Sequence, residues 1–151
     1  LPAWALTGLA SAGVLGHEMG HVIERHGTEA MIREIGTQIL LSAMIGDTSG
    51  LATVASQAAS LSYTRNNERE ADRIGVAMLN KPNIRGAGLS SFFRRLGKDD
   101  TNLDKRVMRY MSTHPLSEER ASTIDSSATG RGEAMSAAEW QALRSICSVK
   151  R

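Results

Sequence analysis

Strict alternation of apolar and polar residues, which is typical of half-buried β-strands, is scarce along this chain. Aromatic residues make up only 4% of the sequence, whereas Ala, Leu, Met and Arg, which favour helices, are abundant. We therefore predict a mainly α-helical fold, a compact helical domain with little or no β-sheet.

Capping and breaking residues divide this pattern into helices. Gly27 is suited to end a first helix, and Thr28 is suited to begin the second. The stretch Gly46–Gly50 breaks the pattern, and Ser136 with Glu139 forms a capping box. The predicted helices span about 3–26, 28–44, 51–79 (with 63–67 as a candidate interruption), 84–96 and 104–111, followed by one that Ser117 caps and one from 136 to about 147.

Length and charge restrict the class of protein. The chain has 151 residues, of which 41% are hydrophobic and 23% charged, as expected for one globular domain. Its net charge of +2 gives no sign of a nucleic-acid partner. The apolar run Ile39–Ile45 is too short to span a bilayer, so we expect a buried helical segment, with an interfacial one as the alternative. The single cysteine, Cys147, excludes an internal disulfide.

Near the start of the chain, residues 17–21 (HEMGH) match the HExxH motif. On a helix His17 and His21 share one face, so both imidazoles can bind one Zn²⁺. Glu18 lies about 100° round the helix and is suited to act as a base on a metal-bound water. The motif is the signature of zinc metallopeptidases, but it also occurs by chance on solvated helices. Residues elsewhere in the chain must therefore decide between a zinc site and an incidental match.

The glycines around the histidines indicate close helix packing. Gly13, Gly16 and Gly20 each cost about 1 kcal/mol relative to alanine inside a helix. We therefore expect another backbone to approach this helix closely, although a simple helix-packing groove would explain the same pattern. On the side away from the histidines we expect the helix to be buried through the apolar residues Leu15, Met19, Val22 and Ile23.

A catalytic zinc site needs three protein ligands and an open position for water. The class that takes a third histidine ten residues after the first is excluded, because Gly27 stands there. His26 would lie about 180° from His17 on a continuous helix and cannot join the metal. The other source is a second helix, where Glu68 can bind zinc while Asp72, one turn later, accepts a hydrogen bond from a ligating histidine.

Two alternatives remain open from the residues themselves. Glu68 and Asp72 could instead belong to a surface charge ladder, together with Glu70, which points nearly the opposite way. The HExxH motif favours the ligand interpretation. His114 before Pro115 is either a turn residue or, in a zinc hydrolase, a group near the open position or the transition-state oxyanion. The arginines of the alternative charge ladder are Arg65, Arg69 and Arg73.

The segments HEMGH (17–21), NEREADRIG (67–75) and STHP (112–115), together with Arg120, resemble the gluzincin metallopeptidases of the HtpX and CaaX-prenyl-protease kind, above all their soluble bacterial envelope members. The resemblance runs from about Gly13 to Arg120. It implies a zincin-like fold in which the HExxH helix packs on an ExxxD helix and one Zn²⁺ is bound per chain. We place the catalytic domain at residues 1–128, and a linker with a C-terminal helix at 129–151.

The resemblance also implies a role for each matching residue. His114 corresponds to a family histidine that either sits over the metal and switches the site off or assists catalysis. Arg120 corresponds to a recurrent family arginine, with an ordinary surface arginine as the alternative. The remaining roles are zinc binding by His17, His21 and Glu68, general base catalysis by Glu18, and orientation of His17 by Asp72.

By resemblance, the function is that of a zinc endopeptidase acting on protein or peptide substrates, misfolded or envelope proteins among them, in the bacterial cell envelope. Family members have an edge strand ahead of the zinc helix, of which Leu1–Gly16 retain little. We therefore expect an incomplete N-terminal region, and any membrane association would use segments outside this sequence. The alternative function is a latent or non-proteolytic zinc-containing assembly factor or chaperone-like module. The oligomeric state is not determined by the sequence.

Overall fold

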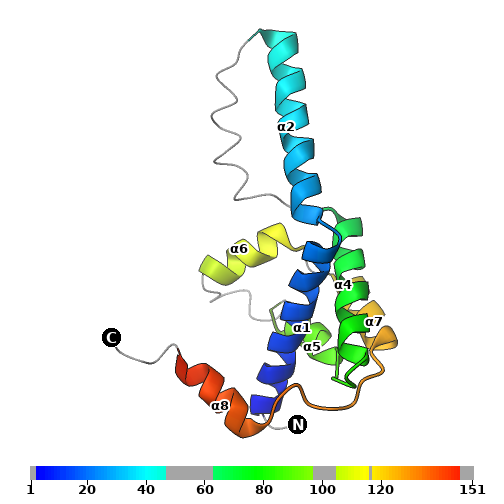
Figure 1. Cartoon of the computed structure of the whole chain (residues 1–151), viewed down its shortest axis with the longest axis vertical. Coiled ribbons are helices and arrows are strands. Elements are labelled where there is room, and N and C mark those ends of the chain that lie inside the picture. Colours follow the sequence, from blue (N-terminus) through cyan, green and yellow to red (C-terminus); the bar gives the residue numbers. More distant parts are fainter. Residues whose placement is uncertain (1–2, 47–62, 97–104, 116, 147–151) are drawn as a thin grey trace.

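The computed structural model describes residues 3–46, 63–96, 105–115 and 117–146, and it is helical through most of these ranges (Figure 1). Within them there is no β-strand, and Ile84 and Gly132 form an isolated parallel bridge. The prediction of a mainly α-helical fold is confirmed. The predictions for residues 47–62 lie outside the described ranges. The helices are α1 (Ala3–Ile23), α2 (His26–Ile45), α4 (Arg65–Asn80), α5 (Ala87–Leu96), α6 (Lys105–Thr113), α7 (Glu118–Ser127) and α8 (Ala137–Ser145).

Helix α1 lies at the centre and packs most extensively on α4 and α5, while α7 closes the bundle against α4 and α5. Figure 1 shows α2 extending away from this bundle and α8 lying near the N-terminal end of α1. The core between α4, α5 and α7 consists of Val76, Leu89, Phe93 and Ile124.

Helices α1 and α4 are in backbone contact, because glycine and alanine face each other along their line of closest approach. A Cβ atom on Gly20 would lie 2.6 Å from the carbonyl oxygen of Ala71, and one on Gly75 would lie 2.8 Å from the carbonyl carbon of Gly16. The predicted close approach of a second backbone is therefore confirmed. As a result, short side chains on α1 and α4 can meet in the space between the helices.

The prediction that α1 buries its apolar side is wrong. The glycines bring the histidine side of the helix against α4, so His17 is fully buried and the opposite side faces outward. The exposed fractions on that side are 62% for Leu15, 41% for Met19, 76% for Val22 and 54% for Ile23.

The apolar run in α2 is also not buried as expected. Ile39 is 55% exposed and Leu40 63% exposed, because α2 makes few contacts with the rest of the bundle. Among the described helices, none has the length and apolar character needed to cross a membrane.

The junction between the first two helices differs from the prediction. Helix α1 ends at Ile23, three residues before the expected end, and α2 begins at His26. The reversal occurs at Arg25, which adopts the left-handed conformation (φ 57°) that Gly27 was expected to adopt. The chain therefore changes direction before His26, and this residue does not continue the helix of His17.

Side-chain caps begin α4, α7 and α8, and the sequence predicted those of α7 and α8. Thr64 and Asn67 form a capping box on α4, and Ser136 with Glu139 forms the predicted one on α8. Ser117 accepts a hydrogen bond from the backbone of Arg120 and caps α7, as predicted. The candidate interruption at 63–67 thus coincides with the start of α4.

The start of the predicted linker, residues 129–132, is hydrogen-bonded to α4 and to the turn that follows it. The Asn80 side chain accepts from the backbone N–H groups of Thr129 and Gly130, and the Gly132 N–H donates to the Asn83 carbonyl at 2.7 Å. These bonds hold the chain after α7 against the end of α4. The division into units at residue 128 stays a prediction.

The contact between α1 and α4 can be tested by adding one methyl group. We expect Gly20→Ala to lower the free energy of unfolding by about 1–3 kcal/mol, because the new Cβ would overlap the Ala71 backbone. The control is Gly36→Ala in α2, where a Cβ meets nothing within 4 Å and helix propensity should raise stability by about 1 kcal/mol. Denaturant unfolding of both variants measures the difference. Equal effects would contradict the close packing.

Candidate metal centre

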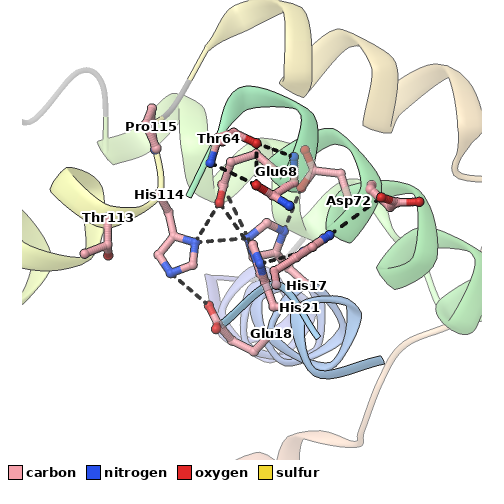
Figure 2. Close-up of polar contacts among 12 residues, drawn as sticks. His17, Glu18, His21, Thr64, Glu68, Asp72, Thr113, His114 and Pro115 are labelled. Atoms are coloured by element: carbon pink, nitrogen blue, oxygen red, sulfur yellow. Dashed lines mark hydrogen bonds and ion pairs between the residues drawn. The ribbon is translucent and has the colours of Figure 1, made fainter. Parts of the chain in front are cut away.

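Four separate elements bring the candidate site residues together (Figure 2). Helix α1 supplies His17, Glu18 and His21 from its buried side, and α4 supplies Glu68 and Asp72 from its first two turns. His114 comes from the turn that follows α6, and Arg120 from the first turn of α7. His17, His21, Glu68 and His114 are all buried, and one donor atom of each lies within 4.8 Å of the others.

Four of the six distances between these donor atoms are short enough for one shared Zn²⁺. His17 Nε2 lies 3.1 Å from His21 Nε2 and 3.3 Å from His114 Nδ1. Glu68 Oε1 lies 3.2 Å from His21 Nε2 and 3.1 Å from His114 Nδ1. Ligands about 2.0–2.1 Å from a tetrahedral Zn²⁺ are separated from one another by about 3.3–3.4 Å. These four distances are therefore close to those in a zinc coordination shell, and the remaining donor pairs lie within 4.8 Å.

The buried charges also favour a cation. Glu68 and Asp72 are both at least 95% buried, and Arg120 is the buried cation that contacts them. Its Nη1 lies 2.6 Å from Glu68 Oε2, and its Nε donates to Asp72 Oδ2 at 2.6 Å. Two carboxylates against one guanidinium leave an excess negative charge in a medium of low dielectric constant, which is costly without a compensating ion. A divalent metal between the imidazoles would balance this excess.

A second carboxylate orients the first histidine. His17 Nδ1 donates to Asp72 Oδ1 at 2.8 Å, which directs Nε2 toward the other donors. Arg120 holds Asp72 in place through Nε and through Nη2, which donates to Oδ1 at 2.9 Å. Arg120 is only 5% exposed, so it is not the surface arginine of the alternative interpretation. The chain His17–Asp72–Arg120 thus fixes which nitrogen of His17 faces the site.

These contacts keep both carboxylates ionised. Burial by itself would raise the pKa of Glu68, but hydrogen bonds with His114 and His21 and the charge of Arg120 lower it to about 2. For Asp72, burial also acts upward, and the hydrogen bonds from Arg120 and His17 outweigh it, so its pKa lies below the ordinary value. Glu68 is therefore negatively charged at neutral pH, as a zinc ligand must be.

Glu18 lies at the edge of this group rather than within it. Its Oε1 atom is 3.8 Å from His114 Nε2 and has no hydrogen-bond partner in the described part of the chain, while the side chain as a whole is 41% exposed. A carboxylate in this position can reach both the donor cluster and solvent. This arrangement suits a group that exchanges protons beside a metal.

Both tyrosines of the chain stack on site histidines, which the sequence analysis did not anticipate. The Tyr63 ring stacks on His21 at 4.0 Å between centroids, and the Tyr110 ring stacks on His114 at 4.5 Å. Burial, followed by the negative charge of Glu18, raises the pKa of both hydroxyls. The sequence shows only that aromatic residues are scarce. It does not indicate that either tyrosine ring would contact a histidine of the site.

His26 is a further residue that the sequence analysis left outside the site. It is 2% exposed, and its Nδ1 lies 3.0 Å from Nδ1 of His21. It does not belong to the group of four donors, as predicted from its position in the sequence. Glu70 is largely exposed and lies 3.6 Å from the other nitrogen of His26, so it does not reach the donor cluster.

Comparison with known proteins supports this geometry. The model of peptidase family M48 matches residues 7–128. This chain belongs to peptidase family M48. The expected zinc is the metal that M48 peptidases use, and the four-donor group is its candidate position. The roles of the individual residues stay predictions.

Several curated proteins resemble the chain at the level of sequence. The beta-barrel assembly-enhancing protease of Escherichia coli K12 is 30% identical over 125 residues, which cover 72% of this chain and 25% of that protein. Metalloprotease YcaL of the same organism is 34% identical over 129 residues, covering 79% of this chain and 49% of that protein. Metalloprotease LoiP is 30% identical over 119 residues, covering 74% and 46%. The chain thus spans between a quarter and a half of these relatives, and no solved structure matches it significantly.

The ligand assignment of this M48 chain can be tested with two neighbouring glutamates. We expect Glu68→Gln to reduce bound zinc well below one per chain, because it removes the buried anionic donor. Glu70→Gln on the same helix should bind zinc as the unmodified chain does, since Glu70 faces outward. Metal analysis after purification without added zinc measures both. The assignment is wrong if the two variants behave the other way round.

Proposed function

We propose that this chain forms the catalytic domain of a zinc-dependent endopeptidase that hydrolyses protein or peptide substrates. The observation that carries the proposal is the convergence of four buried donors on α1, α4 and the turn after α6, with the Glu18 carboxylate beside them. The family match supports the same chemistry.

When bound, Zn²⁺ would polarise a peptide carbonyl and lower the pKa of a coordinated water to about 7. Glu18 would accept the proton of the attacking water, since its free oxygen faces the cluster, and would then deliver that proton to the leaving amine. Asp72 and Arg120 would hold His17 in one tautomer throughout. No Ser or Cys nucleophile is required.

His114 favours a second candidate function, that of a latent enzyme. Its Nδ1 atom lies 3.3 Å from His17 Nε2 and 3.1 Å from Glu68 Oε1, at the corner that water or substrate would need. In this position the histidine could act as a fourth metal ligand, which would close the site to water and substrate. Activity then requires His114 to withdraw, after which its imidazole could stabilise the oxyanion.

An apolar groove next to Glu18 indicates what the site would accept. It has a volume of about 630 Å³ and lies between α1 and α5. Glu18 and Arg95 are its charged residues, so a peptide whose scissile bond lies at Glu18 would place a neighbouring side chain in the groove. We therefore propose a preference for large aliphatic or aromatic residues next to the cleaved bond. The apolar lining comes from Ala10, Val14, Leu15, Phe92 and Leu96.

The names of the relatives support a proposal for the biological role of this activity. One group of them is named for enhancing β-barrel assembly, and we propose by analogy that this chain serves protein quality control in the bacterial cell envelope. Misfolded or unassembled envelope proteins would be the substrates. Exposed apolar segments distinguish such proteins from folded ones, in agreement with an apolar groove beside the base.

The mechanism predicts that a substitution of Glu18 abolishes activity but leaves zinc binding intact. Glu18→Gln should retain about one zinc per chain, because Glu18 is not one of the four donors, and should reduce casein cleavage at least 100-fold. Zinc analysis and a fluorescent casein assay measure the two quantities. Full activity in this variant would refute the role of Glu18 as base.

His114→Ala in the same assays distinguishes the two candidate functions. A latent enzyme closed by His114 should become several-fold more active, while a histidine that only assists catalysis should leave a slower enzyme. A non-proteolytic module would show no cleavage in either form. Zinc should remain bound in all three cases through His17, His21 and Glu68.

The groove predicts a matched pair of variants on α1. Leu15→Asp should lower kcat/KM about tenfold for peptides with a large apolar residue beside the cleaved bond, because Leu15 lines the groove. Val22→Asp should leave kcat/KM unchanged, because Val22 is equally apolar and exposed but lies outside the groove. Both residues are more than 60% exposed, so folding should be little affected. Equal losses in both variants would contradict the assignment of the groove.

A further inference from the structure

The outer nitrogens of the two helix histidines have different partners. His17 Nδ1 meets a carboxylate, Asp72, whereas His21 Nδ1 meets another imidazole, that of His26, at 3.0 Å. His26 is as deeply buried as the donors themselves and yet offers no atom to the metal cluster. The mechanism proposed above therefore leaves this buried histidine without a role.

The fold places His26 beside His21 by a backbone conformation that arginine rarely adopts. On a continuous helix the two side chains would lie about 140° apart and could not meet. The left-handed residue Arg25 (φ 57°, ψ 29°) ends α1 and turns the chain, so that His26 begins α2 next to the ring of His21. This conformation costs a residue other than glycine roughly 1–2 kcal/mol, which the contacts of the buried His26 side chain would help to offset.

Metal binding at Nε2 of His21 would determine the tautomer of both rings. His21 Nε2 faces His17 and Glu68, so its lone pair must be free there to bind a metal. The proton of His21 is then on Nδ1 and is donated to Nδ1 of His26. His26 in turn carries its proton on Nε2, which faces Glu70 Oε2 at 3.6 Å on the outer side of α4. With both protons placed in this way, His21 Nε2 is free to bind a metal, His21 donates to His26, and His26 Nε2–H points to Glu70.

From this geometry we propose that His26 is a positioning residue, which accepts a hydrogen bond from His21 and holds Nε2 of that ring toward the zinc. It would do for His21 what Asp72 does for His17. The inference rests on the proposed zinc site but not on proteolysis. The stacking of Tyr63 on the face of His21 restricts the same ring in the remaining direction.

A neutral acceptor at this position has an electrostatic reason. Glu68 and Asp72 already place two buried negative charges at the site, against one positive charge on Arg120. In the metal-free protein, a third buried carboxylate behind His21 would increase this excess of negative charge. An imidazole supplies the acceptor without the charge and passes the contact on to the exposed Glu70.

The test uses three variants at one position, measured in the full chain carrying Glu18→Gln to prevent autolysis. His26→Leu removes the acceptor at similar volume. His26→Asn keeps an acceptor where Nδ1 stood, and His26→Gln moves it to the position of Nε2. Zinc affinity is measured by competition with a chromogenic chelator, and the Nδ1 proton of His21 is followed by proton–nitrogen NMR in the zinc-loaded protein.

We expect His26→Leu and His26→Gln to weaken zinc binding about 10–100-fold and to lose the slowly exchanging Nδ1–H signal of His21. His26→Asn should stay within about threefold of the parent and keep the signal. The melting temperature of the zinc-free protein should not follow this order, since an apolar residue can fill the same space.

Two results would overturn the proposal. One is a zinc affinity for His26→Leu within twofold of the parent. The other is an equal loss in the Asn and Leu variants that parallels their zinc-free melting temperatures, because this would indicate packing alone. If the parent itself binds no zinc, the proposed metal site fails as well, whereas a parent that binds zinc but cleaves nothing contradicts only the proposed proteolysis.

Discussion

The candidate site depends on the backbone contact between α1 and α4. Gly16 and Gly20 on one helix face Ala71 and Gly75 on the other, with no room for a further methyl group. At a wider separation the imidazoles of α1 and the carboxylates of α4 would not meet at hydrogen-bond distance. Glycine lowers the stability of a helix, but here it allows candidate metal donors from two helices to lie within a few ångströms of each other.

Ion pairs between α7 and α4 hold further residues of the candidate site in place. Arg120 reaches from α7 to both Asp72 and Glu68, and its guanidinium also lies 4.8 Å from the centre of the Phe93 ring in the core. One cation therefore connects the packing of α4, α5 and α7 to the orientation of a metal ligand. Its pKa is raised because the pairs with the two carboxylates outweigh the opposing effect of burial, so it stays charged at any physiological pH.

The turn after α6 differs from the helices in what holds it. His114 occupies the fourth corner of the cluster through contacts with His17, Glu68 and the Tyr110 ring, and the Pro115 carbonyl accepts from Arg120 at 2.6 Å. The candidate ligands of α1 and α4 are fixed by backbone packing, while His114 lies in a turn held by side chains and by backbone hydrogen bonds to Tyr110 and from Tyr63 to Thr113. The proposed latency would require this turn to move while the helices of the bundle stay folded.

The sequence by itself predicted the candidate donors of α1 and α4 and their pairing, since the spacing of four residues in HExxH and in Glu68–Asp72 is a local property of a helix. It also predicted the close approach of a second backbone from the glycines. It could not decide which side of α1 that backbone covers, and the apolar residues from Leu15 to Ile23 indicated the wrong side because side-chain size limited the approach more than hydrophobicity did. The tertiary structure alone placed His26, Tyr63 and Tyr110 at the site and buried Arg120 between two carboxylates. Their positions follow from a left-handed turn and from the packing of helices that are distant in sequence. Neither can be predicted from the local spacing of apolar and polar residues.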